Sequence, residues 1–121
     1  MRFMMIYKPE DMTAAESGVP PTEQEMAAMG AFIAEMAQSG VLLLTDGLQP
    51  SSKGARVRLS GGKVTVTDGP FTEAKELIAG FAIVEVASKA EAIELARRFL
   101  AVAGPGESEI RLMYDTPAYQ R

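Results

Sequence analysis

The sequence predicts an α+β fold, in which a ferredoxin-like split β-α-β sheet carries an inserted β-hairpin. Three observations lead to this prediction: short apolar runs typical of strands, two capping-box motifs that each open a helix, and two alternating segments that flank Gly61-Gly62. In chain order the elements are strand, helix, strand, hairpin, strand, helix and strand. We expect one domain over residues 1–121, because 47% hydrophobic residues at this length suffice for one core.

The first strand and the first helix are separated by a polar segment. Residues 2–7 predict a central strand that is buried on both faces. From Pro9 to Pro21 the chain is polar and interrupted by Gly and Pro, which indicates a mobile surface loop. A capping box at Thr22 to Glu25 opens the helix, and Gly40 ends it. The apolar stripe of this helix is predicted to contain Met26, Met29, Phe32, Ile33, Met36 and Ala37.

The hairpin is the clearest local signal. Residues 41–44 predict an apolar strand, and the segment from Thr45 to Ser52 predicts a loop. The alternating residues 56–67 then predict two strands joined by a Gly61-Gly62 turn. In this register the apolar pairs are Val57 with Val66 and Leu59 with Val64, and the opposite face carries Arg56, Arg58, Thr65 and Thr67. The hairpin ends at Asp68, because Gly69-Pro70 cannot continue a strand ladder.

The second half returns to the strand-helix-strand order. Residues 77–86 predict a long strand with a bulge or a close backbone approach at Gly80. A second capping box begins at Ser88, and residues 108–114 alternate as a last strand. The predicted buried stripe of the second helix is Ile93, Ala96, Phe99 and Leu100.

Both faces of the predicted sheet are apolar. Residues 3–7, 41–44 and, except for Glu85, 81–86 are apolar at consecutive positions, whereas two helices cover only one face of such a sheet. A second copy of the chain, packed sheet against sheet as a two-fold homodimer, is the economical cover for the other face.

The composition excludes several classes of function. The chain has no Cys and no His, so thiolate nucleophiles, disulfides, His-based triads, haem and the usual zinc sites are excluded, and we expect neither a metal nor a cofactor. The net charge is −4 and the basic residues are scattered, which argues against nucleic acid as a partner. No apolar run approaches the roughly 20 residues of a membrane span, and the start lacks a signal-peptide pattern. We therefore expect a cytoplasmic protein without a membrane partner.

The polar residues that follow the hairpin form the candidate site. Asp68 is the candidate catalytic residue, as a general base or as an anchor for a ligand hydroxyl or amine if desolvation raises its pKa. The candidate ligand-binding residues are Arg56, Arg58, Glu73, Lys75, Tyr7 and Asp46. An Arg guanidinium holds a carboxylate in bidentate fashion, which favours small organic acids as ligands. Each residue also has a structural interpretation, such as an Asx-type turn at Asp68 or a surface ion-pair cluster at Lys75.

A four-residue motif carries a family resemblance. Asp68-Gly69-Pro70-Phe71 is followed by Glu73, Lys75 and Glu76, and with these residues the chain resembles the YCII-related family, in the branch named for this motif. Supporting matches are the first strand to Tyr7, the Gly40 to Pro50 segment, Val57-Arg58, Gly80-Phe81, Glu91-Ala92-Ile93 and Glu109-Ile110-Arg111. The resemblance implies a dimeric α+β barrel. It also implies a group whose members are mostly of unknown biochemical function, some of which accompany extracytoplasmic-function sigma factors.

The chain departs from the family pattern in ways that bear on chemistry. The His-Asp pair proposed for better-studied relatives cannot be carried over, because this chain has no His. Ala74 stands where the branch usually has Thr, and Leu112 where Pro is usual. Asp68, Glu73, Lys75 and Arg58 remain in place.

Three hypotheses about function follow, and whether the protein is an enzyme stays open. The leading one is a homodimeric small-ligand-binding or accessory protein with a polar cleft around Asp68. The second is a cofactor-independent enzyme, isomerase, lyase or monooxygenase-like, that acts on a small organic acid or aromatic compound with Asp68 as general base and Arg58 as anion holder. Its main support is analogy between folds. The third is a structural self-association module.

Overall fold

The computed structural model describes residues 1–71, 73 and 77–115. In chain order the elements are β1 (Arg2–Pro9), α1 (Thr13–Ser17), α2 (Glu23–Gln38), β2 (Leu42–Gly47), the 3-10 turn η1 (Ser51–Lys53), β3 (Ala55–Ser60), β4 (Lys63–Asp68), β5 (Gly80–Glu85), α3 (Lys89–Ala103) and β6 (Gly106–Leu112).

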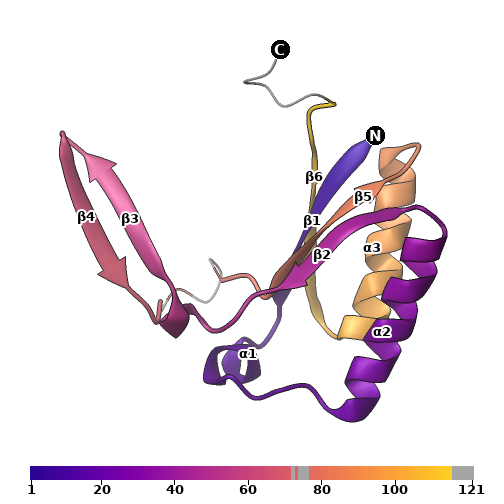
Figure 1. The fold of residues 1–121 in the computed structure, drawn as a ribbon, viewed down its shortest axis with the longest axis horizontal. Coiled ribbons are helices and arrows are strands. Elements are labelled where there is room, and N and C mark those ends of the chain that lie inside the picture. Colours follow the sequence, from indigo (N-terminus) through magenta and orange to yellow (C-terminus); the bar gives the residue numbers. More distant parts are fainter. Residues whose placement is uncertain (72, 74–76, 116–121) are drawn as a thin grey trace.

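The four-stranded sheet has the predicted ferredoxin-like topology. Its strand order is β2-β5-β1-β6 and every neighbouring pair is antiparallel, so β1 is a central strand as predicted. The hairpin β3-β4 is inserted between β2 and β5 and forms a separate two-stranded sheet. Helices α2 and α3 lie on one face of the four-stranded sheet, and the hairpin stands away from it on the other side (Figure 1).

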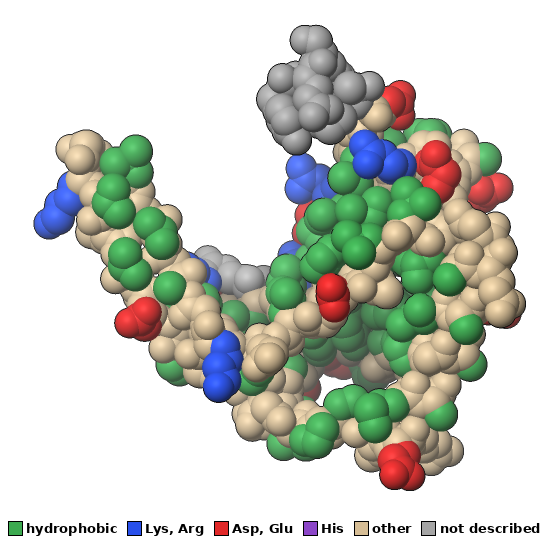
Figure 2. Space-filling model, in the orientation of Figure 1, with side chains coloured by type: hydrophobic (Ala, Val, Ile, Leu, Met, Phe, Trp, Pro, Cys, Tyr) green, Lys and Arg blue, Asp and Glu red, His purple; other side chains and the backbone are tan. Residues whose placement is uncertain are grey.

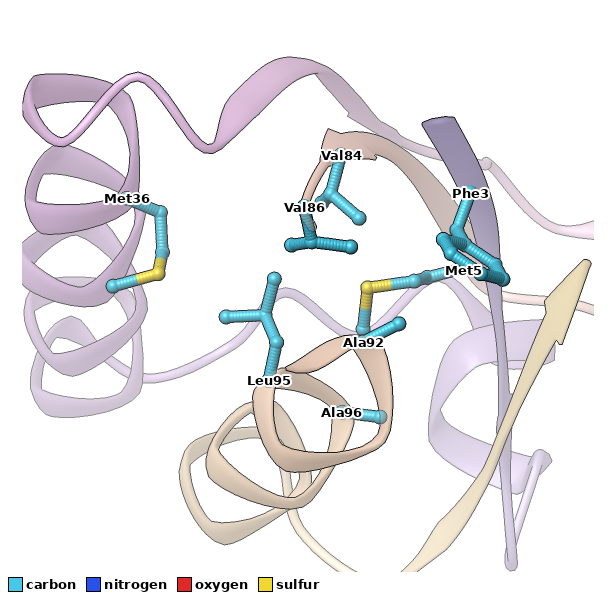
Figure 3. Close-up of a cluster of buried hydrophobic side chains, with 8 residues drawn as sticks. All are labelled: Phe3, Met5, Met36, Val84, Val86, Ala92, Leu95 and Ala96. Carbon is cyan, nitrogen blue, oxygen red and sulfur yellow. The ribbon is translucent and has the colours of Figure 1, made fainter. Parts of the chain in front are cut away.

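The core lies between the sheet and the two helices. Phe3 and Met5 of β1 point toward the helices (Figure 3). Leu95 of α3 lies in the same cluster (Figure 3). Among the described residues, the buried cluster consists of Phe3, Met5, Met36, Val84, Val86, Ala92, Leu95 and Ala96. Burying a large apolar side chain contributes about 1.5–3 kcal/mol, so this cluster holds the helices on the sheet.

The helix caps match the prediction more closely than the buried stripes do. In α2 the Thr22 hydroxyl accepts the Glu25 N–H at 3.1 Å and the Glu25 carboxylate accepts the Thr22 N–H at 3.0 Å. However, Met26 is 52% exposed and Ala37 is also exposed, so both were wrongly placed in the stripe. Helix α2 begins beyond the end of the strands in Figure 1, which leaves its first turns without a sheet to pack on.

The stripe of α3 is shifted from the prediction. Ser88 caps the helix by accepting the Glu91 N–H, but the Glu91 carboxylate accepts the Ala87 N–H rather than that of Ser88. Ile93 is 42% exposed and was wrongly predicted to be buried, whereas the predicted Ala96 is buried, together with Ala92 and Leu95, which were not predicted. Small alanines allow the backbone of α3 to approach the sheet closely. The close packing that results stabilises the helix on the sheet more than burial of the larger Ile93 side chain would.

Two predicted loops contain regular structure. The segment from Pro9 to Pro21 includes α1, which is ended by Gly18 in the left-handed conformation, and Met12 beside it is buried. Strand β2 continues to Gly47, so the predicted loop from Thr45 is wrong at its start, and η1 occupies part of the remainder.

The strand β5 is shorter than predicted, because it begins at Gly80 rather than at residue 77. The predicted close approach at Gly80 is confirmed: a Cβ there would lie 3.0 Å from the Asp46 carbonyl oxygen. The irregularity of pairing lies in the neighbouring strand, between Leu42 and Leu44. Gly47 and Gly80 are paired across the two strands, and the insertion leaves and rejoins the sheet at this pair.

The hairpin register is confirmed residue by residue. Val57 pairs with Val66, and Leu59 with Val64, around the Gly61-Gly62 turn, in which both glycines have positive φ. Because side chains alternate along a strand, these four apolar residues share one face. They are between 59% and 72% exposed. Figure 2 shows hydrophobic side chains along the hairpin and on the side of the rest of the molecule that faces the hairpin.

The sheet face opposite the helices, called here the open face, is apolar at its centre. Its central residues follow from the strand register: Met4 and Ile6 of β1, Leu44 of β2, and Phe81 and Ile83 of β5. No described helix covers them (Figure 1). The prediction that β1 is buried on both faces therefore does not hold within one chain, where Phe3 and Met5 are buried and Met4 and Ile6 are half-buried. No helix among the described residues is long and apolar enough to cross a membrane.

Candidate functional site

The inserted segments all meet at one end of the four-stranded sheet. Strands β1 and β2 finish there and β5 and β6 begin there, as the pairs Tyr7 with Gly80 and Pro9 with Gly106 indicate. Helix α1, turn η1, the base of the hairpin and the loop after Asp68 all connect to this end, called here the loop end. The candidate site lies here because these four connections converge.

A hydrogen-bonded junction at Ser51 joins three of these segments. The Glu16 carboxylate of α1 accepts the Ser51 N–H at 2.8 Å and also the Ser51 hydroxyl. The Ser51 Oγ in turn accepts the Phe71 N–H at 3.0 Å, and the Gly54 carbonyl accepts the Gly69 N–H at 3.1 Å. This Glu16–Ser51 junction fixes the Gly-Pro-Phe segment against η1 and α1.

The junction also explains the glycine of the motif. A Cβ built on Gly69 would lie 1.8 Å from the Ser51 carbonyl oxygen, which is far inside van der Waals contact. The backbone of the loop therefore approaches η1 more closely than a residue with a side chain permits.

Phe71 anchors the loop to the base of the hairpin. Its ring is half-buried, and the Arg56 guanidinium lies over it at 3.9 Å from the ring centroid. Such a cation–π contact at an exposed site is worth about 0.5–1 kcal/mol. One of the two hairpin arginines is thus engaged with the loop.

The structure leaves the Asp68 side chain exposed at the end of β4. Asp68 is paired with Ala55, so the strand pleat puts it on the apolar face of the hairpin, whereas Arg56 and Arg58 belong to the other face. An Asx-type turn needs the amide two residues on, which is Pro70 and has no N–H. Within the described ranges, no hydrogen bond to the Asp68 carboxylate is made, and the next amide, that of Phe71, goes to Ser51.

The remaining predicted residues are dispersed. Asp46 is exposed on the open face at the end of β2, Arg58 is exposed opposite Thr65, and Glu73 is exposed. Lys75 lies outside the described residues.

Tyr7 belongs to the helix side of the sheet. Its ring meets Phe99 edge to face at 5.1 Å, and its hydroxyl donates to the Gly104 and Ala103 carbonyls at 3.3 and 3.5 Å. Burial raises its pKa by penalising the phenolate. In this geometry Tyr7 ties β1 to the end of α3.

Glu16 and Ser51 were not among the predicted site residues. They are separated by 35 positions in the chain, and each stands in a polar segment with no periodic pattern. One feature of the sequence could have indicated the contact: the predicted topology brings the two polar segments that contain Glu16 and Ser51 to the same end of the sheet.

Comparison with known proteins assigns the family. The model of the YCII-related domain matches residues 1–115. The chain belongs to this family. A relative in Rhizobium meliloti, itself an uncharacterised protein, is 34% identical over 110 residues, which cover 89% of this chain and 87% of the relative.

A solved structure supports the fold of this YCII-related protein. The 5-chloro-2-hydroxyhydroquinone dehydrochlorinase of Burkholderia phenoliruptrix, in complex with 2,5-dihydroxybenzoquinone, superposes with a TM-score of 0.52. The match covers 94% of each chain at 15% sequence identity. At this identity the likeness concerns the fold alone.

A second polar feature of the YCII-related chain lies beside the loop end. A groove of about 800 Å³ is lined by Lys8, Pro9, Glu10, Met12, Pro105, Gly106 and Glu107. The Lys8 ammonium is 2.9 Å from Glu109 and 3.7 Å from Glu107. The hydrogen bond with Glu109 raises the Lys8 pKa and lowers that of Glu109. The lysine is thus already neutralised by carboxylates of its own chain. Across the described part of the chain, no three acidic side chains gather as a metal site would require.

The Glu16–Ser51 junction predicts a pH effect on stability. Its hydrogen bonds with Ser51 lower the Glu16 pKa below the ordinary value of 4.5. A lowered folded-state pKa adds stability above the unfolded pKa, and this stability is lost as the pH falls through the folded pKa. Glu16→Gln should therefore lower the melting temperature at pH 7 and flatten its decline below about pH 4.5, measured by thermal denaturation from pH 7 to pH 3. Glu10→Gln, at an exposed site in the same segment, is the matched control and should keep the wild-type profile. Parallel profiles for wild type and Glu16→Gln would contradict the role of the junction.

Proposed function

We propose that the protein is a homodimeric small-ligand-binding or accessory protein whose site lies at the loop end around Asp68. One observation carries the proposal: the Glu16–Ser51 junction holds the loop after Asp68 while the carboxylate itself is exposed and makes no hydrogen bond within the described residues. A rigidly supported loop next to a carboxylate available for binding is the arrangement that preorganised sites use.

The homodimer is supported by the open face. Met4, Ile6, Leu44, Phe81 and Ile83 form a contiguous apolar surface that no described helix covers. A monomer rarely exposes such a patch, and a two-fold dimer covers it by packing the same face on itself. The absence of a nucleic-acid partner stays a prediction from the net charge of −4. A cytoplasmic location stays a prediction.

Two features suggest the class of ligand. The exposed Asp68 carboxylate favours a ligand that donates a hydrogen bond from a hydroxyl or an amine, and small carboxylates test the hairpin arginines, which belong to the other face. The dehydrochlorinase that shares the fold was solved with a small dihydroxylated quinone, so phenols and quinones belong in the same panel. Lactones complete it as neutral analogues.

The test is a thermal-shift panel on wild type and Asp68→Asn. A ligand should raise the melting temperature of wild type. Asp68→Asn should raise the dissociation constant of that ligand ~10-fold or more, because a charge-assisted hydrogen bond is lost. The two proteins without ligand should melt within about 1 °C of each other, because surface substitutions change stability little. Asp115→Asn, at an exposed position away from the loop end, is the control and should bind as wild type. If no compound shifts wild type and Asp68→Asn merely melts lower, the ligand-binding proposal fails and self-association alone remains.

A cofactor-independent enzyme is the second candidate. The specific observation in its favour is the shared fold with a dehydrochlorinase. Asp68 would then act as general base on a bound organic acid or phenol. A pH-rate profile governed by one carboxylate, and abolished in Asp68→Asn, would favour catalysis over binding alone.

A further inference from the structure

The hairpin cannot be stable as an isolated element, yet no part of its own chain that the structure describes covers its apolar face. A two-stranded hairpin alone is marginally stable at best in water. Val57, Leu59, Val64 and Val66 share one face and are between 59% and 72% exposed. Four aligned aliphatic side chains on a free strand pair also invite aggregation unless something covers them.

The position of the hairpin indicates what covers this face. It rises from the loop end on the side of the sheet opposite α2 and α3 (Figure 1), so the hairpin and the open face border the same space. A sheet packed on the open face would stand about 10 Å from it. Each hairpin strand has six residues and spans about 20 Å, which is long enough to extend past that layer.

Two apolar surfaces favour a second copy of the chain as the occupant. The apolar face of the hairpin and the open face of the sheet border the same space, and no described helix covers either of them (Figure 1). A two-fold dimer covers both, because two-fold symmetry makes each contact twice. The three basic side chains of residues 55–68, Arg56, Arg58 and Lys63, lie on the other face of the hairpin.

We propose that the hairpin is an arm that clasps the second subunit, with the face of Val57, Leu59, Val64 and Val66 packed on it. Asp68 lies on that same face at the base of the arm, so the clasp brings its carboxylate to the rim of the subunit interface. The ligand site is then completed by the partner copy. This inference rests on the proposed homodimer and adds the arm to the surface that the dimer buries.

Thiol protection tests the clasp directly, because the chain has no Cys of its own. Val57→Cys and Thr65→Cys introduce one thiol on opposite faces of the arm. At protein concentrations where light scattering gives a dimer, the thiol of Val57→Cys should react with an aromatic disulfide reagent at least ~10-fold more slowly than that of Thr65→Cys. Dilution to monomer, or adding Ile83→Lys on the open face, should remove this protection.

The outcomes separate the arm from the dimer. Equal labelling rates in a proven dimer would overturn the clasp and leave the homodimer intact. Protection of Val57→Cys that persists in the monomer would mean that the arm folds onto its own chain, which also overturns it. A monomer at every concentration would refute both the clasp and the homodimer.

An equilibrium measurement complements the labelling. Val57→Ser with Leu59→Ser should raise the dimer dissociation constant ~100-fold, equivalent to about 2.7 kcal/mol. Thr65→Ser, on the polar face, should leave it unchanged. Circular dichroism must first show that the double variant keeps the wild-type spectrum. An unchanged dissociation constant in the folded double variant would count against the clasp.

Discussion

Ile83→Lys is expected to convert the proposed dimer to a monomer at micromolar concentration, with a dissociation constant raised at least ~1000-fold. Ile83 occupies the middle of the open face, where it is paired with Met4 and with Leu44. Two-fold packing would place two such lysines in the same apolar interface, and burying an unpaired ammonium is strongly unfavourable. Sedimentation velocity over a concentration series measures the change.

A matched control comes from the opposite side of the molecule. Ile93→Lys introduces the same charge on α3, where the isoleucine is already 42% exposed, and should leave the dimer unchanged. Thermal melts establish that both variants are folded. A folded Ile83→Lys protein that remains dimeric would show that the subunits associate through another surface.

Gly69→Ala is expected to destabilise the protein by about 2–3 kcal/mol, the upper part of the range of about 1–3 kcal/mol that is typical of forcing an extra methyl group into a closely packed site. The added Cβ would lie 1.8 Å from the Ser51 carbonyl oxygen, so η1 or the loop must move. The Phe71 N–H bond to Ser51 and the Glu16 contacts would be strained by the same movement. Ligand binding at Asp68 should weaken in parallel.

Gly30 provides the control for this substitution. It lies inside α2, and a Cβ there meets nothing within 4 Å. Gly30→Ala should therefore stabilise the protein by about 0.5–1 kcal/mol through helix propensity. Urea denaturation of the two variants gives both values. If Gly69→Ala were as stable as wild type, the close contact between the loop and η1 would not exist in solution.

The parts of the fold that local chemistry determines could be predicted from the sequence. The hairpin register follows from alternation around Gly61-Gly62, and a slip by one residue would place valine beside arginine. The helix starts at Thr22 and Ser88 follow from side chains that satisfy nearby amides. The sheet order then follows from the sequence of elements.

The features that could not be predicted depend on contacts between distant segments. Whether Ile93 or Ala92 faces the sheet is decided by how closely α3 approaches it, and neighbouring apolar residues give no warning of this. The short helix α1 has few apolar residues, and its carboxylate Glu16 contacts Ser51, 35 positions along the chain, through the tertiary fold. The same holds for the candidate site, where Asp68 was predicted but the groups that fix its loop were not.

The pairing of Gly47 with Gly80 has a consequence for how this chain can vary. Opposed residues of antiparallel strands have Cα atoms about 5 Å apart, which a two-residue turn can bridge. β2 and β5 could therefore be joined directly in place of residues 48–79 while their own ladder stays paired, with loss of the contacts between Ser51 and Glu16. Recombination or design could replace these residues, which include the hairpin arm and the Asp-Gly-Pro-Phe loop, and retain the four-stranded sheet.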